Sequence, residues 1–394
     1  MKKGGKNCCV NIIIMSDCRY GKFIMTKYSE VMTHRERFAA CMNYQPADRL
    51  PVYIFGYWDE ALDRWHQEGL PSNLTVAEAV GLDQDWEEGM WSLHGLATPW
   101  PRSPEPEIIL EEADDWRLVR TSLGTVERRS KIGSSLSQLI TPALEPTRES
   151  WNRFRGFLDA AAAIPQPDDW EEKVETLNNR DRVATFMAGS LYGWPRDWMG
   201  VEGISYLMYD DPILLEEILD YLSNHYITLF RPMLERVQFD FAYIFEDCCG
   251  KSGPLFSPTI YRRHFDKYYR RMLEFYRGMG IPHMLIDSDG WVDDLAPCWV
   301  ESGFDILFPI EVGTWGADPR AFRKRFGRDL RMMGGVDKHV IARGEAAIRA
   351  HLEPLRPLVE EGGFLPIPDH RIPPEVSLEQ LKTYVRVFKE VFNG

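Results

Sequence analysis

Acidic side chains and one histidine follow short apolar runs in the second half of the chain. Asp287 and Asp289 come after the apolar residues 284–286, and His370 comes after the run 364–368. Two acids two residues apart on an extended segment point to the same face, so their repulsion needs a cation, a proton or a basic partner. This spacing is compatible with a metal ion held by hard oxygen ligands, and equally with a carboxylate pair that caps the next helix.

His370 adds a group that titrates near neutral pH. Its imidazole can ligate a metal or act as a general acid or base, although a single histidine can also be a hydrogen-bonded structural group. Tyr192 follows another apolar run, residues 182–189, and its hydroxyl group could also donate a proton. Both residues are therefore candidates for proton transfer, with Asp287 as a stabiliser of charge.

Five apolar runs carry the acids and the histidine, and segments of helical pattern separate them. Such runs predict parallel strands in βα units, because strands buried on both faces are apolar throughout. Polar groups at the carboxyl ends of these strands converge on one face, which carries the active site in a (β/α)8 barrel. We therefore predict an α/β fold, a (β/α)8 TIM barrel. The runs are 241–247, 282–289, 304–311, 330–337 and 364–370.

Other residues are predicted to surround the same cleft. Glu246, Asp247, Glu311 and Asp337 stand at the ends of three of the runs, and Tyr57 and Trp58 follow the run expected to be the first strand. A cleft lined with aromatic rings fits a flat or apolar ligand. We expect Tyr57, Trp58, Glu246 and Asp337 to contact the substrate.

One barrel domain is predicted to span residues 32–394, with its first strand at residues 52–55. Thr33 and Glu36 have the spacing of a capping box at the start of a first helix. Alternating runs within residues 81–135 predict an antiparallel hairpin inserted in the barrel. Residues 1–31 differ from the rest, and we expect a disordered N-terminal extension or an upstream-extended reading frame.

The bulk composition narrows the classes of partner. The 394 residues carry a formal charge of −14, which disfavours nucleic acid because phosphate binding needs clustered lysine and arginine. Seven cysteines without a CxxC pair indicate a reducing cytoplasm. No apolar stretch is long enough for a membrane span. A small-molecule substrate is the expected partner, and the oligomeric state is left open.

The order of several motifs resembles the uroporphyrinogen decarboxylase superfamily, which includes the corrinoid:coenzyme M methyltransferases. The resemblance covers the chain from Thr33 to its C-terminus and implies a (β/α)8 barrel whose cleft lies at the carboxyl ends of the strands. The motifs are THRERF at 33–38, PADRLPV at 46–52, GPLFSP at 253–258, MGGVD at 333–337 and HRIPPEVSLE at 370–379.

The sequence is more similar to the methyltransferase branch than to the decarboxylases. Decarboxylases hold substrate carboxylates with an arginine-rich stretch after the first strand, whereas this chain has no arginine there before Arg64. In the methyltransferases a His-x-Cys pair and a later cysteine bind zinc, and here Asp287-x-Asp289 and His370 stand at those positions. Each replacement can bind a metal. The resemblance thus implies a divalent metal, zinc being expected, at these three residues, completed by Glu246 or Glu311.

The leading hypothesis is a methyltransferase-like enzyme with the metal as a Lewis acid. A methyl group would pass between a small substrate and a corrinoid carried by a separate protein. One alternative is a metal-independent decarboxylase or lyase of a small acid, with His370 or Tyr192 as proton donor and Asp287 as charge stabiliser. Another is a non-enzymatic protein that binds a corrinoid or a tetrapyrrole.

Overall fold

The computed structural model of the chain describes residues 31–84, 86, 95–133 and 137–394. Residues 32–394 form one unit by their internal contacts. The predicted N-terminal extension, residues 1–31, lies outside the described residues except for Val31.

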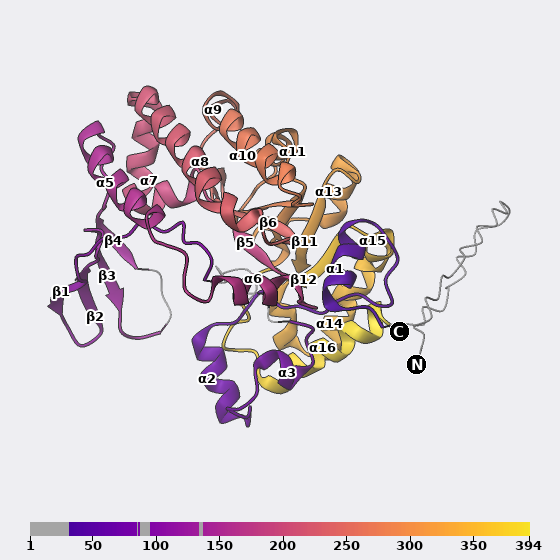
Figure 1. Ribbon diagram of the computed structural model, residues 1–394. Coiled ribbons are helices and arrows are strands. Elements are labelled where there is room, and N and C mark those ends of the chain that lie inside the picture. Colours follow the sequence, from indigo (N-terminus) through magenta and orange to yellow (C-terminus); the bar gives the residue numbers. More distant parts are fainter. Residues whose placement is uncertain (1–30, 85, 87–94, 134–136) are drawn as a thin grey trace, which may run out of the picture. The chain divides into compact units, whose positions relative to one another are not determined.

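Six parallel strands form the main sheet, in the order β12-β11-β10-β9-β6-β5 (Figure 1). Nearly all their residues are buried, as expected for strands covered on both faces. The register places Asp287 of β9 between Phe245 of β6 and Phe308 of β10. The five acid-bearing runs are therefore five adjacent strands. The bounds are β5 Thr185–Met187, β6 Phe241–Phe245, β9 Met284–Asp287, β10 Ile306–Ile310, β11 Arg331–Val336 and β12 Phe364–Pro368.

Helices connect successive strands, because parallel neighbours can be joined only by a crossover. α8 and α10 lie side by side against the sheet (Figure 1). Thr33 and Glu36 form the predicted capping box at α1. No helix of the described residues is long and apolar enough to cross a membrane. The bounds are α1 His34–Met42, α2 Asp59–Gln67, α3 Val76–Val80, α5 Arg148–Ala162, α6 Trp170–Asn178, α7 Gly193–Asp210, α8 Pro212–Leu234, α9 Pro258–Ile260, α10 Asp266–Gly278, α11 Ala296–Ser302, α12 Val312–Trp315, α13 Pro319–Phe326, α14 Glu345–Leu352, α15 Arg356–Glu361 and α16 Leu378–Phe392.

The predicted closure of this sheet into an eight-stranded barrel is not detected among the described residues. Residues 52–55, the expected first strand, are buried but pair with no strand. Their backbone bonds elsewhere: the Val52 N–H donates to the Asp83 carboxylate at 2.7 Å, and the Asp83 N–H donates to the Val52 carbonyl at 3.0 Å. A bridge between Tyr57 and Ile372 is the strand-like pairing that the structure describes between this part of the chain and the residues after β12.

The predicted antiparallel insertion is present and larger than a hairpin. Four strands form a separate sheet in the order β1-β2-β3-β4, drawn as purple arrows in Figure 1. The residues of its two edge strands, β1 and β4, are exposed. The guanidinium carbon of Arg128 lies 4.0 Å from the ring centre of Trp116. The bounds are β1 Ile108–Glu112, β2 Trp116–Arg120, β3 Val126–Ser130 and β4 Gln138–Thr141; a small pair, β7 Cys249–Gly250 and β8 Gly253–Pro254, follows β6.

We expect Asp83→Asn to lower the free energy of unfolding by about 2–3 kcal/mol. The buried Asp83 carboxylate accepts hydrogen bonds from Arg49 and the Val52 N–H and lies 3.1 Å from His34 Nδ1. The amide removes the charge that these donors face. Urea unfolding would measure the loss, with the exposed Asp329→Asn as matched control. Equal midpoints for the two variants would contradict this role of Asp83.

Candidate active site

A cavity of about 240 Å³ lies where β6 and β9 end. We call it the acid cavity. Five of the residues predicted at the cleft line it together, namely Trp58, Asp247, Asp287, Asp289 and His370. The structure thus brings the two acids of the 287–289 pair and the distant histidine into one site. The complete lining is Phe55, Trp58, Phe245, Asp247, Asp287, Asp289, His370 and Arg371.

Asp287 is the last residue of β9 and is buried. The Tyr243 hydroxyl donates a hydrogen bond to its Oδ2, and its backbone carbonyl accepts the N–H groups of Glu246 and Asp247 at 2.8 and 3.1 Å. Burial raises the pKa of the Asp287 carboxyl well above its usual range, and the charges of Asp289 and Asp247 raise it further. This carboxyl group therefore keeps its proton to a higher pH than an ordinary aspartate and can act as a proton donor.

His370 faces Asp289 across the acid cavity. Its Nε2 lies 3.6 Å from Asp289 Oδ2, close enough for an ion pair but longer than a good hydrogen bond. Phe55 meets the imidazole edge-on at 5.4 Å, and Trp58 stacks on it at 6.1 Å between ring centres. The buried Nδ1 has no hydrogen-bond partner among the described residues.

Asp247 adds a third carboxyl group to the cavity. Its φ of 44° is a left-handed conformation that non-glycine residues rarely adopt. Its Oδ1 accepts the Asp289 N–H at 3.0 Å, and its Oδ2 lies 3.5 Å from Arg196 Nη1. Burial raises the pKa of Asp247, and Asp289 adds to that effect while Arg196 opposes it.

Arg371 supplies a positive charge to the same cavity. Its guanidinium carbon lies 5.1 Å from the ring centre of Trp58, within the range of a cation–π contact. Sequence reasoning did not select Arg371 or Arg196. For Arg371 the available signal was its position directly after His370, whereas Arg196 comes from α7 and carries no local signal.

Five other predicted site residues do not line the acid cavity. Glu246 is buried beneath the start of α7, where it accepts the N–H groups of Leu191, Tyr192 and Gly193 at 2.9, 2.7 and 2.9 Å. The Tyr192 ring packs on Phe256, and its hydroxyl has no hydrogen-bond partner among the described residues.

Tyr57 and Asp337 lie outside the acid cavity as well. Tyr57 packs edge-on against Trp65. Asp337 caps the turn after β11 by accepting the His339 N–H at 2.9 Å. Their expected contacts with a substrate stay predictions.

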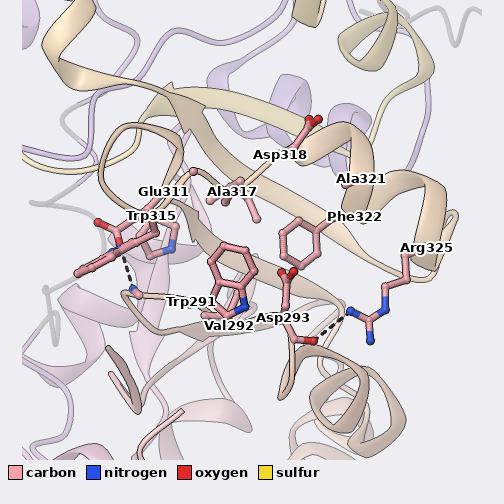
Figure 2. A pocket seen from close by; sticks show the side chains of 14 residues that line it. Trp291, Val292, Asp293, Glu311, Trp315, Ala317, Asp318, Ala321, Phe322 and Arg325 are labelled. Carbon is pink, nitrogen blue, oxygen red and sulfur yellow. Dashed lines mark hydrogen bonds between the residues drawn. The ribbon is translucent and has the colours of Figure 1, made fainter. Parts of the chain in front are cut away.

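Glu311 directly follows β10 and lines a second cavity, of about 230 Å³, shown in Figure 2. The Gly290 N–H donates to Glu311 Oε2 at 2.7 Å. Burial raises the pKa of Glu311 to about 8, with a further contribution from the charge of Asp289. A charge in the acid cavity therefore affects the pKa of Glu311, although Glu311 itself lines the second cavity.

Comparison with known proteins bears on the part of the chain that supplies most of the lining of both cavities. Residues 196–391 match the family model for uroporphyrinogen decarboxylase (URO-D). This supports the uroporphyrinogen decarboxylase superfamily. No curated protein matches the sequence. The URO-D match includes Asp247, Asp287, Asp289 and His370, and it does not separate the decarboxylases from the corrinoid-dependent methyltransferases.

The geometry of the acid cavity does not fit the predicted metal centre. Among the described residues, no group of three or more histidine, cysteine, aspartate or glutamate side chains is placed to hold a metal ion. Asp287 Oδ2 accepts a hydrogen bond from the Tyr243 hydroxyl, and Glu311 lines the neighbouring cavity instead of this one. What the cleft does offer is three carboxyl groups, one imidazole and one guanidinium, a set suited to proton transfer.

We expect Glu311→Gln to flatten the pH dependence of stability between about pH 4.5 and 8. The pKa of Glu311 is raised on folding, so the protonated carboxyl stabilises the fold below its usual pKa. That stabilisation is lost as the pH rises through about 8. Glutamine stays uncharged throughout this range. Urea unfolding at pH 5, 6.5 and 8 compares the two proteins, and parallel losses of stability would argue against a buried, protonated Glu311.

Proposed function

We propose that the protein decarboxylates a small carboxylic acid by acid–base catalysis in the acid cavity. The observation that carries the proposal is Asp287, a buried carboxyl group with a raised pKa that faces the same cavity as His370 and Arg371. Such a group is a proton donor at neutral pH. The URO-D match is compatible with this chemistry.

The size of the acid cavity supports a small substrate. Pockets for drug-sized ligands occupy roughly 300–1,000 Å³, whereas this one measures about 240 Å³. A tetrapyrrole is larger than that class of ligand. Arg371 is the only arginine or lysine among the described residues that line the cavity, and a guanidinium suits the binding of a substrate carboxylate.

The residues have distinct roles in the proposed reaction. Arg371 orients the substrate carboxylate, and the apolar rings of Phe55 and Phe245 limit the access of water. The bond between carbon and the carboxyl group breaks, its electron pair stays on the carbon, and CO₂ leaves. The Asp287 proton forms the new C–H bond. His370, paired with Asp289, returns a proton from solvent to Asp287.

Methyl transfer is the second candidate, and one observation favours it. Asp287, Asp289 and His370 line a single cavity, and they stand where the similar methyltransferases hold their zinc ligands. In that reaction a corrinoid on a separate protein would exchange the methyl group with a small substrate. As placed, these three side chains do not form a metal site.

We expect Asp287→Asn to lower kcat for decarboxylation by about 100-fold or more while KM changes little, because a general acid acts only in the transition state. A panel of small aliphatic and aromatic acids in D₂O provides the assay, and the product should gain one deuteron for each CO₂ released. Asp329→Asn is the matched surface control. Undiminished turnover by Asp287→Asn would remove this carboxyl group from the mechanism.

Chelation separates the two candidate functions. Protein purified without a chelating column should keep its decarboxylase activity after exhaustive EDTA treatment, because its proton donors need no metal. Metal content and the absorbance of methylcobalamin would be measured in parallel, for the native protein and for Asp289→Ala and His370→Ala. Zinc-dependent demethylation of methylcobalamin, lost in both variants, would favour the methyltransferase over the decarboxylase.

A further inference from the structure

A third cavity, of about 640 Å³, is larger than the two described above. One wall is the second half of α8, whose lining residues recur every three or four positions and so belong to one helix face. The end of α5, the connection to α6 and residues 95–98 form the other walls. We call it the α8 cavity. The described lining is Gly95, Leu96, Ala97, Thr98, Asp159, Ala161, Ala162, Ile164, Pro165, Gln166, Pro167, Trp170, Tyr221, Asn224, His225, Thr228, Leu229 and Pro232.

The α8 cavity is separate from the site of the proposed reaction. It shares no described lining residue with the acid cavity or with the second cavity. The last turns of α8 lead toward the start of β6 at Phe241, whereas the acid cavity lies where β6 ends. The proposed decarboxylation uses none of the residues of the α8 cavity, so a function of this cavity is independent of that proposal.

Most of the walls of the α8 cavity are apolar. Leu96 and Trp170 are buried, and three prolines add rigid rings to the lining. Pockets with apolar and aromatic walls and volumes of roughly 300–1,000 Å³ are typical binding sites for small molecules. A cavity of about 150 Å³ accepts benzene in another protein, so about 640 Å³ has room for more than one ring.

His225 is a buried polar side chain in this lining, 9% exposed. Its ring stacks on Tyr221 at 5.7 Å between ring centres, and its Nε2 has no hydrogen-bond partner among the described residues. Burial lowers the pKa of His225, so the imidazole is uncharged at neutral pH. This histidine therefore brings no positive charge to the wall.

Charge is scarce in the rest of the lining. Asp159 is the only aspartate, glutamate, lysine or arginine among the described residues that line the cavity. Its Oδ1 accepts the Tyr221 hydroxyl at 2.5 Å, and the residue is exposed, so water screens the attraction that it offers to a cation. An anion would meet no lysine or arginine in this lining. Either kind of ion would lose hydration against apolar walls.

We propose that the α8 cavity is a binding site for a small, uncharged, apolar molecule. Burial of the ligand's apolar surface against these walls supplies the affinity. The scarcity of charge in the lining supplies the selectivity, because an ionic ligand of the same shape would lose its hydration without gaining a buried partner of opposite charge.

N-Phenyl-1-naphthylamine is the probe, because it is uncharged and apolar and its fluorescence rises in an apolar environment. Three competitors share one naphthalene ring and differ in charge: 1-naphthylmethanol, 1-naphthylmethylammonium and 1-naphthoate. At pH 7 we expect saturable binding of the probe to the native protein. We expect 1-naphthylmethanol to displace it at a concentration at least tenfold lower than either ion requires.

Three variants locate the bound probe. Thr228→Trp and Ala162→Trp each fill the cavity from an exposed lining position, one on α8 and one on α5, and each should weaken probe binding at least tenfold. Ile213→Trp is the matched control, because Ile213 is 75% exposed in the first turn of α8 and does not line the cavity. This control should bind the probe as the native protein does.

Several results would overturn this inference. They are absent or non-saturable probe binding, displacement by either ion at a concentration within tenfold of that of 1-naphthylmethanol, unchanged affinity in Thr228→Trp or in Ala162→Trp, and an equal loss of affinity in Ile213→Trp. None of these measurements involves the release of CO₂, so each result leaves the test of the proposed decarboxylation unaffected.

Discussion

Asp247, Asp287 and Asp289 crowd three carboxyl groups into one small cavity at the ends of β6 and β9. Burial strengthens their mutual repulsion, since little water remains to screen it. The surrounding groups each relieve part of it: Tyr243 donates to Asp287, Arg196 pairs with Asp247, and His370 faces Asp289. Burial and the repulsion that remains raise the pKa values of Asp247 and Asp287. These two carboxyl groups therefore retain a proton to a higher pH than ordinary aspartates do.

Much of the fold could be predicted from the sequence, because the apolar runs in the chain are the segments that the structure buries as strands. Fully apolar runs predict strands covered on both faces, and five such runs became the adjacent strands from β6 to β12. The 287–289 pair and His370 could be placed at one cleft, 80 residues apart in the chain, because the carboxyl ends of parallel strands share an edge. The capping box at Thr33 was equally local, since its partners lie three residues apart.

Other parts of the site depended on contacts that no local pattern encodes. Residues 52–55 have the sequence pattern of a strand. The Val52 N–H, however, donates its hydrogen bond to the Asp83 carboxylate instead of to a carbonyl of a neighbouring strand. Glu246 and Asp247 are adjacent acids, and only the tertiary structure assigns one to the start of α7 and the other to the cavity. The left-handed backbone of Asp247 and the approach of Arg196 from α7 are likewise invisible in the sequence.

The turn at Gly290 separates Asp289, which lines the acid cavity, from Trp291, which lines the second cavity. Helix α13 contributes Ala321, Phe322 and Arg325 to one side of this turn and nothing to the lining of the acid cavity on the other. Substitutions along that helix can reshape the second cavity while every residue that lines the acid cavity stays the same. The two linings can therefore vary independently during evolution, and Gly290 marks the boundary between them in the sequence.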